Sequence, residues 1–158
     1  MKGDKDVLKH LNKILKNELT AINQYFLHSR MLNDWGVRKL GKHEHDESID
    51  EMKHADRLIT RILFLDGLPN LQELNKLLIG ESVKEIIECD LRLEMLGIPD
   101  LKDAIVHCEK VQDYTSRNLF REILDSEEEH VDFLETQLSM IEKMGLQNYV
   151  QLQSEAED

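Results

Sequence analysis

The sequence has only two prolines, two cysteines and no long apolar run. Because proline interrupts helices, its scarcity permits long helical segments. Cys89 and Cys108 are 19 positions apart on one expected helix. That spacing separates them by about 28 Å and excludes a disulfide within one chain. No apolar stretch approaches the roughly 20 residues of a membrane span, and residues 1–6 lack the apolar part of a secretory signal. We therefore expect a cytoplasmic protein with reduced thiols and no membrane partner.

Basic residues are also in deficit. The chain has 20 lysines and arginines against 32 aspartates and glutamates, which gives a formal charge of −12. Such a balance disfavours nucleic acid as a partner and is compatible with attracting cations. A length of 158 residues suits one domain with a well-buried core, so we expect a single domain over 1–158.

Apolar residues recur every three or four positions, which predicts four long helices at about 5–34, 38–65, 82–111 and 114–144. The first two helices, and the last two, are separated by only a few residues, so each pair is expected to form an antiparallel hairpin. Residues 67–81 form a longer link that can extend about 50 Å, more than the roughly 42 Å length of such a helix. The second and third helices can therefore run parallel. The fold predicted is an all-α four-helix bundle with one long crossover, the arrangement of ferritin-like proteins.

Two local features affect the helix limits. The run Gly97-Ile98-Pro99 would ordinarily end a helix, but the apolar pattern keeps its phase from Leu91 to Leu101. We therefore expect a kink and not a break. Residues 146–153 are predicted to form a short fifth helix, and residues 154–158 an acidic, frayed tail.

Six polar residues lie on the otherwise apolar faces of the four long helices. They are Glu18, Glu51, His54, Glu94, Glu127 and His130. Glu51 follows Glu18 by 33 positions, and Glu127 follows Glu94 by the same number. The four glutamates each lie about 12 to 13 residues into a helix, so antiparallel packing would bring them to one level. Two glutamates and two Glu-x-x-His pairs are the ligand set of ferritin-like di-metal sites.

Buried carboxylates without a counter-charge would take up protons, so four at one level predict cations between them. Carboxylate and imidazole suit iron, manganese or zinc, and redox-active iron gives such a site an obvious purpose. A single Glu-x-x-His is more often a surface ion pair, but here both copies fall on core faces at matching depth. We assign the ligands as Glu18 with His54 on one ion, Glu94 with His130 on the other, and Glu51 and Glu127 bridging.

The second helix also has a second apolar face. Met52 lies next to Glu51 and is therefore turned about 100° away from the metal-facing side. The residues on this second face are His45, Ile49, Met52 and Ile59, matched on the first helix by Leu19, Asn23 and Phe26. A helix that is apolar on two faces needs a second partner, which a two-fold dimer supplies.

These residues resemble the bacterioferritin family along essentially the whole chain, from residues 1–4 to residues 145–149, with residues 47–56 the most telling stretch. Met52 resembles the methionine that, together with its copy from a two-fold related subunit, ligates a haem from both sides. The resemblance implies haem b shared between two subunits. The residues that would line it are Leu19, Asn23, Phe26, His45, Ile49 and Met52.

The resemblance further implies a shell of 24 subunits with a di-iron ferroxidase centre in each. The expected reaction is oxidation of Fe²⁺ by dioxygen or hydrogen peroxide and storage of ferric mineral in the cavity. The haem would assist iron release, with electrons from a [2Fe-2S] bacterioferritin-associated ferredoxin. Leu68, Glu81 and Glu85 are candidates for its docking surface and equally for ordinary surface residues. Whether the shell is a homo-oligomer or contains a second subunit type stays open.

The chain departs from the family in places. Some members have histidine at position 46 in an inner-surface iron site; Asp46 here would have to act with Asp50 or His45. Leu58 and Phe133 replace a tyrosine and a tryptophan, which leaves Tyr25 as the aromatic candidate for electron transfer.

Three other functions are compatible with parts of the sequence. A haem-free di-iron oxidase or peroxidase of the rubrerythrin type uses the same ligands, but this chain has no room for a redox domain. A DNA-protecting miniferritin is disfavoured by the acidic tail. A metal-free structural bundle would predict that removing metal leaves stability and colour unchanged.

Overall fold

The computed structural model describes residues 1–155 and contains no strand in that range. Its helices are α1 (Lys5–Asp34), α2 (Arg38–Phe64), α3 (Val83–Lys110), α4 (Tyr114–Met144) and α5 (Leu146–Ser154). The predicted all-α class is confirmed, and each predicted helix limit lies within one residue of the observed one. Of the expected tail, residues 156–158 lie outside the described part. None of these helices is long and apolar enough to cross a bilayer.

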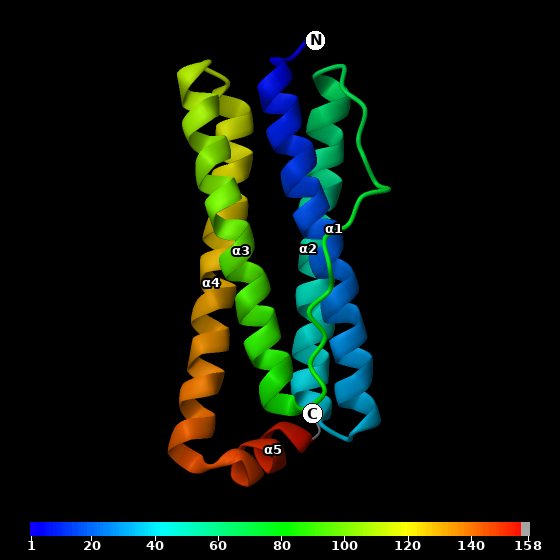
Figure 1. The fold of residues 1–158 in the computed structure, drawn as a ribbon, viewed down its shortest axis with the longest axis vertical. Coiled ribbons are helices and arrows are strands. Elements are labelled where there is room, and N and C mark those ends of the chain that lie inside the picture. Colours follow the sequence, from blue (N-terminus) through cyan, green and yellow to red (C-terminus); the bar gives the residue numbers. More distant parts are fainter. Residues whose placement is uncertain (156–158) are drawn as a thin grey trace.

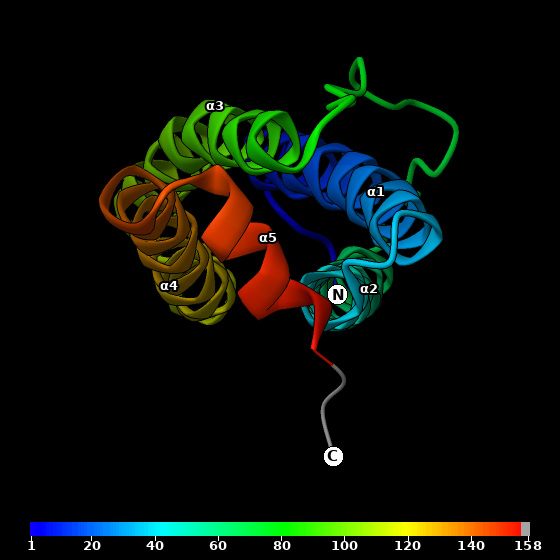
Figure 2. The same cartoon turned by 90° about the horizontal axis from the view of Figure 1, so that it is seen from below.

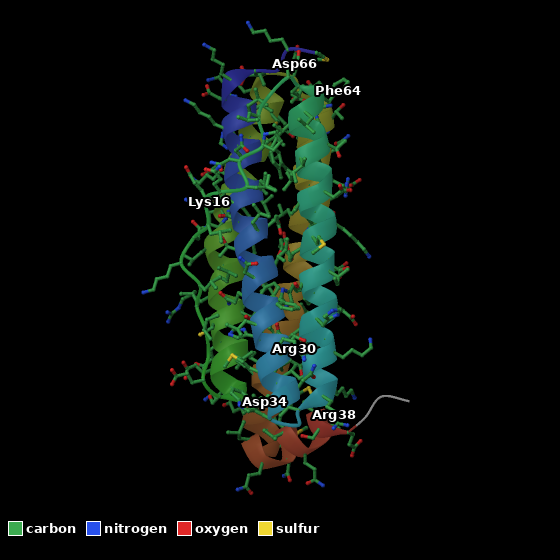
Figure 3. The ribbon with its side chains drawn as sticks, turned by 90° about the vertical axis from the view of Figure 1, so that its right-hand side faces the viewer. Lys16, Arg30, Asp34, Arg38, Phe64 and Asp66 are labelled. Carbon is green, nitrogen blue, oxygen red and sulfur yellow. The ribbon has the colours of Figure 1, made fainter. Side chains whose placement is uncertain are left out.

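The four long helices form the predicted bundle (Figure 1). α1 and α2 run antiparallel, as do α3 and α4, while the crossover between α2 and α3 descends the length of the bundle. α2 and α3 are therefore parallel. α5 lies across the end at which α4 finishes, as the view along the bundle shows (Figure 2). Figure 3 shows the face made by α1 and α2, with Asp34 and Arg38 at one turn and Phe64 and Asp66 where the crossover begins.

Local sequence signals explain where the helices begin and end. Asp4 accepts hydrogen bonds from the first turn of α1, and Ser82 and Asp113 do the same for α3 and α4. Gly145 has a φ of 84°, a value that favours glycine, and it separates α4 from α5. α3 continues through Pro99 without ending, as predicted.

The interior has an apolar cluster on each side of a polar middle. One cluster includes Leu11, Leu58 and Phe120, and the other, near α5, includes Leu40 and Tyr149. The glutamates singled out in the sequence lie between these clusters along every long helix. The polar middle is therefore held by apolar packing from both directions.

The crossover is fastened to α1 by side chains of α1, which the sequence analysis did not anticipate. The hydrogen bonds run from Asn70 N to Asn12 Oδ1 (2.8 Å), from Asn75 N to Thr20 Oγ1 (2.9 Å), from Leu78 N to Gln24 Oε1 (2.9 Å) and from Gly80 N to His28 Nε2 (3.0 Å). Thr20, Gln24 and His28 are four residues apart and share one face of α1. These bonds satisfy backbone donors that an irregular segment cannot pair by itself.

Replacing Gly80 by alanine is expected to destabilise the protein. A Cβ at this position would lie 2.3 Å from the backbone nitrogen of Ile86 and 2.6 Å from the carbonyl carbon of Glu85, and neither atom can move independently. We expect a loss of about 1 to 3 kcal/mol in the free energy of unfolding, measured by denaturant titration. The matched control is Gly97→Ala in α3, where the nearest atom is 3.8 Å away. Equal midpoints for the two variants would contradict this account.

Candidate metal centre

The structure brings the six polar residues of the sequence prediction together in the middle of the bundle. Glu18 comes from α1, Glu94 from α3, and the two Glu-x-x-His pairs from α2 and α4. The four glutamates are at most 5% exposed. His130 is 3% exposed, and His54 is half-buried.

The potential ligand atoms form two overlapping groups, each with its atoms within 4.8 Å of one another. One group is Glu18, Glu51, His54 and Glu127, and the other is Glu51, Glu94, Glu127 and His130. Nδ1 of His54 lies 3.4 Å from Glu51 Oε2, 3.5 Å from Glu127 Oε1 and 3.7 Å from Glu18 Oε2. Nδ1 of His130 lies 3.2 Å from Glu94 Oε1. Glu51 and Glu127 belong to both groups, which is the position that bridging ligands require.

Several polar atoms at this centre have no hydrogen-bond partner. They are Glu51 Oε2, His54 Nδ1 and Glu127 Oε1. Burial raises the pKa of Glu51, and burial together with the neighbouring charges of Glu51 and Glu94 raises the pKa of Glu127 well above its usual value. Orphaned oxygen and imidazole atoms are costly in a protein interior unless a cation binds them. The donor set of carboxylate oxygens and imidazole nitrogens fits iron, manganese or zinc.

The pKa of Glu94 is lowered, unlike the pKa values of Glu51 and Glu127, and the pKa of its partner His130 is raised. Burial opposes ionisation of Glu94, but hydrogen bonds from Glu127 and His130 outweigh it and hold the pKa of Glu94 below its usual value. Burial likewise disfavours the charged imidazole, yet the bond to Glu94 raises the pKa of His130 to about 9. The buried Tyr25 hydroxyl donates a hydrogen bond to Glu94. The Tyr25 and His130 rings are nearly perpendicular, with their centroids 5.1 Å apart. Tyr25 therefore lies directly beside the centre.

A cavity of about 360 Å³ opens beside the centre between α1, α3 and the crossover. All four glutamates of the centre line it. Its other lining residues include Lys13, Lys16, Asn75, Lys76 and Leu78. Figure 3 shows Lys16 on the α1 side next to the crossover. Small molecules and ions thus have a direct route from the surface to the carboxylates.

The structure adds residues that the sequence analysis missed. Glu47 Oε2 lies 3.8 Å from His130 Nδ1, and burial raises the pKa of Glu47. It sits one turn before Glu51 on α2, a spacing that could have indicated it. A second buried polar cluster contains Gln24, His28, Glu44 and Asp90.

The second apolar face of α2 is largely open in the single chain. Met52 is 51% exposed, Phe26 52% and Ile49 37%. Asn23 and His45 are exposed beside them, and Leu19 and Ile59 are half-buried. The face therefore presents a thioether beside the apolar side chains of Phe26 and Ile49, with Asn23 and His45 as its polar members. This fits a haem, because soft sulfur is a known haem ligand and the macrocycle is apolar.

The inner-surface iron site stays a prediction. Asp46 accepts a hydrogen bond from Lys42 at 2.9 Å, and Asp50 lies 3.8 Å from Lys53. Within residues 1–155, neither aspartate belongs to a group of potential metal ligands. Leu58 is fully buried, and the centroid of the Phe133 ring lies 3.5 Å from that of the His43 ring. Neither leucine nor phenylalanine is a redox-active side chain.

Comparison with known proteins agrees with this fold. A family model described as a ferritin-like domain matches residues 8–144. A bacterioferritin of Brucella melitensis biotype 1 is 49% identical over 158 residues, all of this chain and 98% of the relative. Bacterioferritins of Mycolicibacterium paratuberculosis and Rhodobacter capsulatus are 50% and 48% identical over 94% and 96% of this chain, and 94% of each relative.

A helical bundle with two Glu-x-x-His pairs in its middle defines a ferritin-like, metal-binding protein. Within that class the chain belongs to the bacterioferritins, a family of iron-storage proteins.

Proposed function

We propose that this protein is a ferroxidase that oxidises Fe²⁺ at the six-residue centre and stores the ferric product. The carrying observation is the pair of overlapping ligand groups that share Glu51 and Glu127. The unpartnered atoms of Glu51, His54 and Glu127 support it, because they leave the metal-free centre unsatisfied. The bacterioferritin relatives support the choice of iron over manganese or zinc.

In this proposal Fe²⁺ is the substrate, and the chain positions two ions for a joint reaction. Glu18 with His54 would hold one ion and Glu94 with His130 the other, while Glu51 and Glu127 span both. Two Fe²⁺ ions supply the two electrons that convert dioxygen to hydrogen peroxide, or hydrogen peroxide to water. His130 has to give up its proton before Nδ1 can bind a metal. The bond from Tyr25 fixes the orientation of Glu94.

We propose that Met52 holds haem b together with its copy from a two-fold related subunit. The exposed apolar residues around it, Phe26 and Ile49, would then be covered by the macrocycle and the second subunit. When bound, a bis-methionine haem supplies one-electron redox chemistry. The protein's part is to exclude water from this face and to fix the position of the two thioethers.

We propose a cytoplasmic shell of 24 subunits that encloses the mineral and receives electrons for iron release from a [2Fe-2S] ferredoxin. Leu68 is 84% exposed at the start of the crossover, and Glu81 and Glu85 are exposed near its end. An exposed leucine accompanied by carboxylates is suited to transient docking of a partner protein.

The test is an optical spectrum of the size-separated protein followed by an Fe²⁺ oxidation trace on the same sample. We expect a Soret band on a particle of shell size and a fast phase that saturates at about two Fe²⁺ per subunit. A colourless small oligomer with rapid oxidation would indicate instead a haem-free di-iron oxidase or peroxidase. Absence of any fast phase would contradict the ferroxidase proposal.

A further inference from the structure

Two histidines meet at the end of the bundle opposite α5. His10 lies near the beginning of α1, and His107 lies in the last turn of α3. Figure 1 shows that the beginning of α1 and the end of α3 reach the same end of the bundle. The centroids of the two rings are 5.3 Å apart. His10 precedes Glu18 by eight positions, about 12 Å along α1, so the pair is separate from the metal centre.

Two carboxylates lie beside these imidazoles. Nε2 of His107 is 2.9 Å from Asp4 Oδ1, although the two residues are 103 positions apart in the chain. Asp4, Asp6 and His107 each offer one potential ligand atom, and these three atoms lie within 4.8 Å of one another. Asp6 precedes His10 by four positions, so their side chains lie on the same face of α1. The fold therefore gathers two carboxylates and two imidazoles from two helices.

Helix capping accounts for only part of this arrangement. Asp4 Oδ1 accepts hydrogen bonds from the backbone N–H groups of Asp6 and Val7, as an N-cap residue does. Within residues 1–155, the other oxygen of Asp4 has no hydrogen-bond donor. The carboxylate of Asp6 has only the exposed Lys9 nearby, at 3.9 Å. Capping requires neither the Asp6 carboxylate nor the His10 ring.

The spacing of the two rings fits a shared metal ion. Two imidazoles that bind one tetrahedral ion, at metal–nitrogen distances of about 2.1 Å, have ring centroids about 5.2 Å apart. The observed separation of His10 and His107 is 5.3 Å. His10 is not among the three residues whose ligand atoms already lie together, so its side chain has to rotate to reach the ion. Its ring is only half-buried, which leaves room for that rotation.

The local charge and the donor types favour a transition metal. Asp103 adds a third carboxylate close to His10, while the charge of the nearby Lys13 is balanced by Asp100 at 3.2 Å. Imidazole nitrogen suits zinc, copper and nickel, whereas magnesium and calcium prefer sites made of oxygen alone. The later first-row divalent metals also bind a given set of nitrogen and oxygen ligands most tightly.

We propose that four side chains at this end of the bundle bind one divalent ion of the later first-row metals, represented by Zn²⁺. They are Asp4, Asp6, His10 and His107. The ion replaces the proton between His107 Nε2 and Asp4, and that proton passes to solvent. The bound ion ties the beginning of α1 to the end of α3. The proposal does not depend on the ferroxidase function, because none of these residues belongs to the centre.

The first test is equilibrium dialysis of the metal-free protein against Zn²⁺ in a weakly chelating buffer, with bound zinc measured by atomic absorption. His107→Gln removes the imidazole but keeps a side-chain donor for Asp4. We expect this variant to bind one Zn²⁺ per subunit fewer than wild type. Glu88→Gln, which removes an exposed carboxylate elsewhere on α3, is the control and should bind as much zinc as wild type.

Two further variants test the remaining ligands without touching the N-cap or the bond between His107 and Asp4. His10→Gln and Asp6→Asn should each weaken binding of this Zn²⁺ at least about tenfold, since loss of even an indirect contact to a metal ligand costs that much. Circular dichroism checks that all three variants are folded. If His107→Gln does not fold, the affinities of the other two variants still decide the outcome.

Two results would overturn the proposal. Equal zinc content in wild type and folded His107→Gln would show that any additional zinc binds elsewhere on the surface. Unchanged affinity in both His10→Gln and Asp6→Asn would show that the four side chains do not act as one site. Failure of the ferroxidase proposal would look different. Zinc binding at the central glutamates would then be missing from every sample, while the difference of one Zn²⁺ between wild type and His107→Gln would remain.

Discussion

Glu18→Ala is expected to slow the fast phase of Fe²⁺ oxidation by more than about 100-fold, because loss of even an indirect contact to a metal ligand typically costs 10- to 100-fold. Glu18 is 4% exposed and is the α1 carboxylate of the group around His54. Without it one ion has an incomplete ligand set, and the two-electron reaction loses its second electron donor. Stopped-flow absorbance after Fe²⁺ addition measures the rate.

The proposed shell should still assemble, because the substitution removes a buried negative charge from a repulsive cluster and leaves the flanking apolar clusters intact. His130→Ala should give the same kinetic loss by emptying the other ion position. The control is Glu128→Ala, which changes an exposed glutamate next to Glu127 on α4. Rapid oxidation in Glu18→Ala, or an equal loss in Glu128→Ala, would invalidate the ligand assignment.

Met52→Ala is expected to remove the haem, because it would remove the protein ligands of the haem iron. We expect the ratio of Soret to protein absorbance to fall at least about tenfold. One substitution removes both ligands, since the haem is proposed to lie between two copies of the residue. Met52 points away from the metal centre and is 51% exposed in the single chain. Fe²⁺ oxidation should therefore stay within about twofold of wild type, because distant sites act independently.

The control for haem binding is Met95→Ala, which removes a methionine of α3 that is 55% exposed. It should keep a full haem complement. If Met52→Ala retains its haem, the iron is bound by another residue. If the haem is lost together with oxidation, the two sites are coupled or the variant is misassembled, and particle size by light scattering separates these results.

The sequence was sufficient for the helices and for the grouping of the six polar residues. Helix limits followed from apolar periodicity, a signal that repeats every three or four positions. The grouping of Glu18 with His54 followed from how far each ligand lies along its helix. In antiparallel helices, residues at equal depth lie at the same level of the bundle. Both kinds of information are local or nearly so.

Other features depend on contacts between distant segments, and the sequence did not reveal them. Gln24 and His28 look like ordinary polar residues of α1 until Asp90 and the crossover are placed against them. Glu44 has no spacing relation to Asp90 that marks the pair. The proximity of Glu47 to His130 likewise depends on how α2 packs against α4.

The bonds between α1 and the crossover also set the register of the crossover against α1. From Asn12 to His28, α1 advances about 24 Å, and the matching stretch of crossover from Asn70 to Gly80 covers this distance in ten steps. That is roughly 2.4 Å per residue, short of the roughly 3.3 to 3.6 Å of a fully extended chain, so the hydrogen bonds to α1 and not chain tension hold the register of the crossover. Asn75 also lines the cavity beside the metal centre. The hydrogen bonds that anchor the crossover to α1 therefore also hold one wall of the cavity beside the carboxylates.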